Sequence, residues 1–171
     1  MTIGYAITLA FAVGLAVAYF AIVKKREFWL SLLYVCVAVV NLGYLLLSMA
    51  RVVEFAIFAN DVAYLGSVFL SMCMLLTIVK LCGFEIGKVH VIICVTLGVV
   101  MFAMIATAGI LPWYYEEVSL TFIDGSAKLV KEYGPLHDVY LVYLLGYFAA
   151  MVATIIHSVR RKNTRPISLR D

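Results

Sequence analysis

Charged residues are scarce in this chain of 171 residues, where they make up 13% against 65% hydrophobic residues. A soluble domain carries about 25% charged residues. The polar surface is therefore too small to cover a soluble fold, and the mean hydropathy of +1.08 indicates an integral membrane protein. Only three prolines occur, all at expected helix ends or in tails, so none of them breaks a long apolar segment.

Catalytic and metal-binding signatures are absent as well. No HExxH, GxSxG or phosphate-loop pattern occurs, and the polar residues His137, Asp138, Glu116 and Glu117 are too scattered for an acid–base constellation. We therefore expect no enzymatic activity, no cofactor and no metal. The four cysteines lie within or at the ends of apolar segments and have no metal-ligand spacing, which favours a packing role: Cys36, Cys73, Cys82 and Cys94.

Five apolar segments are long enough to cross a bilayer, which takes about 20 residues. The first has no charged start and is too long for a signal peptide, so we expect it to be retained. The sequence predicts an all-α integral membrane helix bundle over residues 1–159, followed by a basic cytoplasmic tail or linker over residues 160–171. The expected helices cover residues 3–23, 28–50, 59–81, 89–111 and 136–159.

The basic residues predict the orientation of the chain. Ten of the thirteen lie in three segments on one side of the expected helices, within residues 24–26, 80–88 and 160–170. Since positive loops stay in the cytoplasm, we expect an outside N-terminus and a cytoplasmic C-terminus in a bacterial cytoplasmic membrane. Membrane anchoring and contacts with lipid headgroups account for the net charge of +3, so no nucleic-acid partner is expected.

The longest polar stretch before the C-terminus separates the last two expected helices. Within it, Asp124 and Gly125 stand between two runs rich in apolar and β-branched residues. An Asp-Gly pair readily adopts the positive φ angles of a two-residue turn, so we expect a β-hairpin over residues 117–132, outside the membrane. Two alternatives stay open: the hairpin is a lid over the outer mouth of the bundle, or it is a passive connector.

Polar residues follow one face of the second, third and fifth expected helices at spacings of three and four residues. Such stripes converge on a ligand pocket in the outer half of the bundle, or they form hydrogen bonds between helices; both readings stay open. Aromatic residues at the start of the outer loop lie at the expected membrane interface. The candidate ligand-binding residues are Asn41, Tyr44, Tyr64, Trp113, Tyr114, Asp138, Tyr140, Tyr143 and Tyr147.

Four stretches resemble a known family. They read NLGYLLLSMA from Asn41, DVAYLGSVFLSMCMLL from Asp61, PWYYEEVSLTFIDG from Pro112 and EYGPLHDVYLVYLLGYF from Glu132. Their order resembles the N-terminal seven-helix membrane domain of bacterial sensor histidine kinases, which is also found ahead of diguanylate cyclase modules. Here the first five helices are present, so the chain is either a fragment or a natural short form.

The resemblance implies a sensory input module that detects an extracytoplasmic or membrane-borne ligand. It would pass a shift in helix position to a cytoplasmic kinase or cyclase module, in cis or in trans. Besides that module, the expected partners are the lipid bilayer, an unidentified small-molecule or lipid ligand, and a second copy in a homodimer. The alternative is a transporter or an accessory membrane subunit, although charges confined to helix ends disfavour transport.

Overall fold

The computed structural model describes residues 2–107, 114–123 and 125–163. In this part of the chain, five helices and one two-stranded antiparallel sheet follow one another, as the sequence predicted. The elements are α1 (Thr2–Ile22), α2 (Phe28–Ser48), α3 (Val53–Leu81), α4 (Lys88–Ile105), β1 (Tyr115–Ile123), β2 (Ser126–Tyr133) and α5 (His137–Asn163).

All five helices in the described residues are long and apolar enough to cross a membrane. A 21-residue helix such as α1 is about 31 Å long at 1.5 Å per residue, which matches a hydrocarbon core of about 30 Å. Most large apolar side chains of α1 are exposed at the surface of the protein. Within α1, Ala12 is buried. The expected membrane bundle of five helices, with a hairpin between the fourth and fifth, is confirmed.

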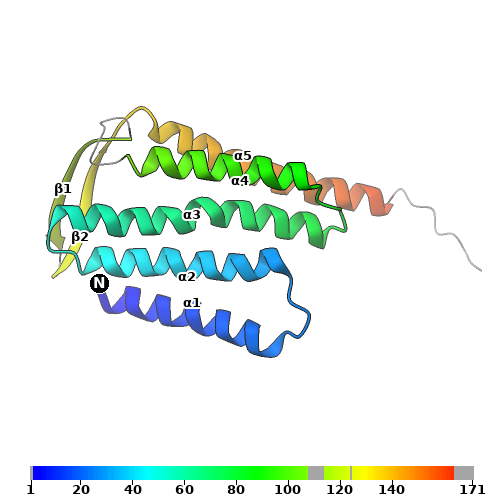
Figure 1. The fold of residues 1–171 in the computed structure, drawn as a ribbon, viewed down its shortest axis with the longest axis horizontal. Helices are drawn as coiled ribbons and strands as arrows, with labels where there is room; N and C mark the ends of the chain where they lie inside the picture. The colour runs from blue at the N-terminus through cyan, green and yellow to red at the C-terminus, as the bar shows by residue number, and fades with distance from the viewer. Residues whose placement is uncertain (1, 108–113, 124, 164–171) are drawn as a thin grey trace, which may run out of the picture.

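Helix α3 is the centre of the bundle. In Figure 1, α1, α2 and α3 lie side by side in chain order, α4 and α5 lie beyond α3, and the hairpin crosses one end. Helix α3 contacts α2, α4, α5 and both strands. It also carries the largest set of buried residues, many of them small. A displacement of α3 would therefore be felt by every element except α1.

Two glycines bring α2 and α3 into close contact. A Cβ atom on Gly43 would lie 2.4 Å from the backbone nitrogen of Ala63. One on Gly66 would lie 2.8 Å from the carbonyl oxygen of Cys36. Small residues at such positions let membrane helices approach and gain van der Waals contact, which drives helix association where lipid removes the hydrophobic effect.

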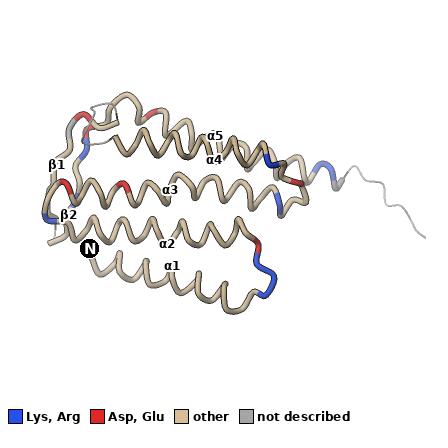
Figure 2. Tube along the Cα trace, viewed as in Figure 1, with Lys and Arg blue, Asp and Glu red and all other residues tan. Residues whose placement is uncertain are grey.

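Charge gathers at the two ends of the molecule. Figure 2 shows basic residues at the connection between α1 and α2, near the turn between α3 and α4, and along the last part of α5. We call this the basic end and the opposite one the hairpin end. At the basic end, Lys80 Nζ lies 2.6 Å from Glu27 Oε1. Glu27 also caps α2, because its Oε2 accepts a hydrogen bond from the Leu30 backbone N–H at 2.8 Å.

The hairpin pairs β1 with β2 in the register expected from an Asp-Gly turn. Ile123 lies opposite Ser126, and Tyr115 lies opposite Tyr133. Gly125 has a φ of +75°, a conformation that glycine adopts at low cost. Its neighbour Asp124 lies outside the described residues. The strands begin and end slightly beyond the expected range of 117–132, and an irregularity between Tyr115 and Glu117 shifts their register.

The largest difference from the sequence-based boundaries is at the start of α3. The sequence predicted a third helix from residue 59, yet α3 begins at Val53. Glu54 in the first turn interacts favourably with the positive end of the helix dipole. Asp61 therefore lies inside the helix. Helix α5 also continues to Asn163, and the residues expected to end the fourth helix, 108–111, lie outside the described part.

Candidate functional site

A half-buried lysine, Lys131, fastens the hairpin to the centre of the bundle. Along β2, Ala127 and Leu129 are buried, and Lys131 continues their alternation toward the helices. Its ammonium group donates a short hydrogen bond to Oδ1 of Asn60 on α3. The Asn60 amide nitrogen in turn donates to the Tyr115 hydroxyl of β1 at 3.3 Å. One buried amide therefore joins both strands to α3.

Aromatic rings complete the surroundings of this lysine. The Lys131 ammonium lies 5.3 Å from the ring centroid of Tyr64 and 5.1 Å from that of Tyr115. Each distance is within the range of a cation–π interaction, worth about 0.5–2 kcal/mol depending on desolvation. We call the group formed by Lys131, Asn60, Tyr64, Tyr115 and the neighbouring Asp61 the lysine clamp.

Burial and charge act in opposite directions on the clamp lysine. Burial lowers the pKa of Lys131 to about 8, because the ammonium loses hydration. The Asp61 carboxylate opposes this shift by favouring the charged form. The Asp61 Oδ1 atom is buried and has no hydrogen-bond partner. The charge of the clamp therefore depends both on the burial of Lys131 and on the Asp61 carboxylate.

Tyrosine rings continue from the clamp into the bundle. Tyr64 contacts Tyr114 and Tyr140 edge-on, with centroid distances of 5.9 and 5.3 Å. Tyr140 is followed along α5 by Tyr143 at 6.3 Å and by Tyr147 after a further 4.8 Å. Edge-on and offset ring pairs contribute about 0.5–1.5 kcal/mol each beyond their buried area. This continuous set of contacts connects the hairpin end to the middle of α5.

The structure separates the candidate residues into groups. Tyr114 and Tyr140 are buried and belong, with Tyr64 packed against them, to one apolar cluster in the bundle. Asn41 donates to the Val37 carbonyl of its own helix at 2.8 Å. Asp138 is exposed in the first turn of α5, and Trp113 lies outside the described residues.

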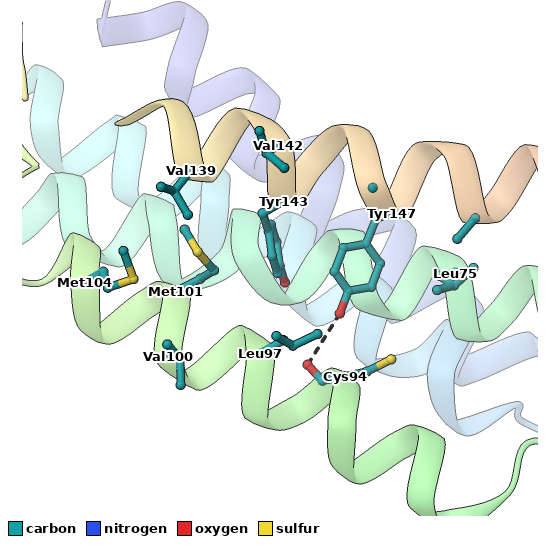
Figure 3. Close-up of a pocket in the computed structure, with 12 residues that line it drawn as sticks. Leu75, Cys94, Leu97, Val100, Met101, Met104, Val139, Val142, Tyr143 and Tyr147 are labelled. Atoms are coloured by element: carbon teal, nitrogen blue, oxygen red, sulfur yellow. Dashed lines mark hydrogen bonds between the residues drawn. The ribbon is translucent and has the colours of Figure 1, made fainter. Parts of the chain in front are cut away.

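Tyr143 and Tyr147 line an apolar groove between α4 and α5. Figure 3 shows this groove with both tyrosines and, across from them, Leu97 and Met101 of α4. Its volume is about 530 Å³. The Tyr143 hydroxyl donates to the Val68 carbonyl at 3.0 Å, and the Tyr147 hydroxyl donates to the Cys94 carbonyl at 3.4 Å. Because backbone carbonyls take up both hydroxyls, this groove offers hydrocarbon contact and little polar recognition.

Tyr44 does not belong to the cluster of Tyr64, Tyr114 and Tyr140 and lies beside Lys131 of the clamp. Its ring stacks on Tyr5 of α1 with a centroid distance of 6.1 Å. Together with Lys131, both tyrosines line a hollow under β2. Reasoning from the sequence missed Lys131 and Tyr5. The signal for Lys131 was its place two residues after Leu129, on the inward side of an alternating strand.

The described residues contain no group of three His, Cys, Asp or Glu side chains placed to hold a metal ion. The polar chemistry of the hairpin end is that of hydrogen bonding and ion pairing. Fold and site together define a multi-pass membrane helix bundle with a hairpin fastened over one end.

Comparison with known families assigns this bundle. The model of the family described as the N-terminal 7TM region of histidine kinase matches residues 6–168. The chain belongs to this family, which supplies the membrane sensory input region of histidine kinases. The resemblance found in the sequence is thereby confirmed. No curated protein and no solved structure matches the chain.

Proposed function

We propose that this chain is the sensory input module of a bacterial signal-transduction protein. It detects an extracytoplasmic or membrane-borne ligand at the hairpin end and passes a helix shift to a cytoplasmic output. The observation that carries this proposal is the lysine clamp, since Lys131 and Tyr115 fasten both strands to Asn60 on the central helix. Of the candidate residues, Tyr44 and Tyr64 lie beside Lys131 and belong to the proposed site.

The distribution of charge supports the orientation in this proposal. The basic end carries the lysines and arginines that stay in the cytoplasm during membrane insertion. The N-terminus of α1 lies at the opposite end, next to the hairpin. The hairpin and the clamp then face the outside of a bacterial cytoplasmic membrane. A stimulus arriving from outside, or from the outer leaflet, then reaches the end of the bundle that carries the clamp.

Helix α3 offers a rigid connection between the two ends. From Asn60 to Lys80 it extends about 30 Å at 1.5 Å per residue. At the basic end, Lys80 pairs with Glu27 at the start of α2. In the turn after α3, Phe84 stacks on His157 of α5, with ring centroids 5.5 Å apart. A shift of α3 would therefore change contacts at the ends of α2 and α5.

A ligand acts through this connection only if it binds one helix arrangement more tightly than another. Releasing or tightening the clamp supplies two such arrangements, because the hairpin is either held on Asn60 or freed from it. The output partner in this proposal is a cytoplasmic kinase or cyclase module, in cis or in trans. We further propose that a second copy of the chain is a partner, in a homodimer.

The experiment joins the catalytic core of a histidine kinase after Asp171 and measures autophosphorylation in inside-out vesicles. Asn60→Ala breaks the clamp, so we expect a changed phosphorylation rate. Asn41→Ala is the matched control, because the Asn41 side chain bonds within its own helix. Equal rates in the Asn60→Ala, Asn41→Ala and unsubstituted proteins, at equal membrane abundance, would contradict the proposal.

A further inference from the structure

Among the residues that the structure describes, three basic residues lie away from the basic end, and all three border two adjoining hollows. The first hollow, of about 380 Å³, lies between the ends of α1 and α2 and strand β2, and Lys128 and Lys131 line it. The second, of about 530 Å³, shares Ser48 with the first and is lined by Arg51. Volumes of this size hold small organic ligands.

The charge of these hollows differs from that of the surface around them. The hairpin end is rich in carboxylates, since it carries Glu54, Asp61, Glu116, Glu132 and Asp138. Among the residues that the structure describes, however, no carboxylate lines either hollow. A recess lined by charges of one sign concentrates the field and attracts ligands of the opposite sign. An otherwise acidic end thus presents one basic recess.

The walls of the first hollow also offer donors and flat apolar surface. Tyr5, Tyr44 and Tyr133 line it with phenol groups, whose hydroxyls donate hydrogen bonds readily to anions. The rings of Tyr5 and Tyr44 are stacked, with 20° between their planes, and provide a surface for the carbon part of a ligand. Lys131 belongs both to this hollow and to the clamp.

We propose that the first hollow binds a small organic anion that carries a carboxylate or phosphate group. The anion pairs with the ammonium groups of Lys128 and Lys131, while its carbon skeleton lies against Tyr5 and Tyr44. This inference rests on the proposed sensory function and names the chemical class of the stimulus. Because Lys131 belongs both to this hollow and to the clamp, binding of the anion and the hydrogen bond to Asn60 are coupled through one ammonium group.

The test uses the full chain in phosphatidylcholine nanodiscs, with alanine and leucine methyl groups labelled for NMR. Ala127 and Leu129 line the hollow and report binding, whereas Leu97 in the groove between α4 and α5 is the remote reference. Benzoate and phenyl phosphate are the probes, and benzamide is the neutral control. We expect the anions to shift the Ala127 and Leu129 signals and to leave Leu97 unchanged.

Substitutions decide whether charge causes the shift. Lys128→Gln removes one exposed charge from the first hollow, and Arg51→Gln removes one from the adjoining hollow. We expect each to weaken anion binding by up to about fivefold, the range of exposed ion pairs. Lys88→Gln at the basic end should leave the dissociation constant unchanged. Equal shifts from benzoate and benzamide, or unchanged affinity in both Lys128→Gln and Arg51→Gln, would overturn the proposal.

The anion has two possible sources, a soluble compound or a lipid headgroup. Nanodiscs containing phosphatidylglycerol separate them. Methyl shifts caused by this lipid alone, and reduced in Lys128→Gln, support the anion site and assign it to the headgroup. Shifts that need the soluble probes support it with a soluble ligand. No shift in either arm overturns it. This test measures binding without any output. A negative result here therefore does not contradict the proposed sensory function, which the phosphorylation assay of Asn60→Ala tests, and a negative phosphorylation assay does not contradict anion binding.

Discussion

Replacing Asn60 by alanine should weaken the attachment of the hairpin to the bundle, while its hydrogen bonds with Thr2 and its apolar contacts remain. The substitution removes the acceptor of the Lys131 ammonium and the donor to the Tyr115 hydroxyl. Losing a hydrogen bond to a charged group costs about 1.5–3 kcal/mol, and losing a neutral one about 0.5–1.5 kcal/mol. The hairpin should therefore be less strongly held by about 2–4 kcal/mol, which favours detachment about 30-fold to 1,000-fold.

Amide hydrogen exchange in nanodiscs measures this change. A two-stranded hairpin is marginal by itself, so its ladder amides should exchange each time it detaches. We expect the protection of amides between Val118 and Lys131 to fall by the factor given above in Asn60→Ala. Protection in α2 and α3 should change little, and Asn41→Ala should behave like the unsubstituted protein. Hairpin protection within threefold of the unsubstituted value would refute the reasoning.

Three further predictions concern charge, packing and capping. In NMR of 13C-labelled lysine, Lys131 should titrate near its pKa of about 8. Asp61→Asn should lower the titration midpoint of Lys131, because the carboxylate that favours its charged form is lost. A Lys131 midpoint near 10 in the unsubstituted protein would contradict the clamp geometry. Gly43→Ala should destabilise the chain by about 2 kcal/mol in detergent unfolding, because its Cβ would collide with α3, whereas Gly14→Ala, with open space around the new atom, should not. Glu27→Ala should cost about 1 kcal/mol in the same assay, mostly through the lost helix cap; an unchanged midpoint would remove the cap from the account.

The sequence predicted the helices and the hairpin because their signals are local. Hydropathy over about 20 residues identifies a spanning helix, and the residues around Gly125 identify a two-residue turn. The start of α3 was missed because Arg51 and Glu54 interrupt a short apolar run. Charges at the first turn are compatible with a helix that ends near the membrane surface. Composition therefore could not tell whether the residues before 59 belong to the helix or to the connection that precedes it.

The candidate site was only partly accessible to the same reasoning. A spacing of three and four residues places Tyr140, Tyr143 and Tyr147 on one side of α5, but it cannot tell a core from a groove. In the structure, Tyr140 and Tyr147 are buried in the core of the bundle, while Tyr143 and Tyr147 also line the groove. The clamp brings together Lys131 and Asn60, which are 71 positions apart in the chain, so only the folded structure reveals it.

The coupling of the clamp to the basic end is the central claim, and a distance measurement tests it most directly. Spin labels at Leu81, at the end of α3, and at Val159 of α5 occupy exposed positions, and pulsed electron resonance in nanodiscs reports the distribution of distances between them. We predict that Asn60→Ala shifts or broadens this distribution, whereas Asn41→Ala reproduces that of the unsubstituted chain. Identical distributions in all three proteins, together with a released hairpin in hydrogen exchange, would contradict transmission through α3.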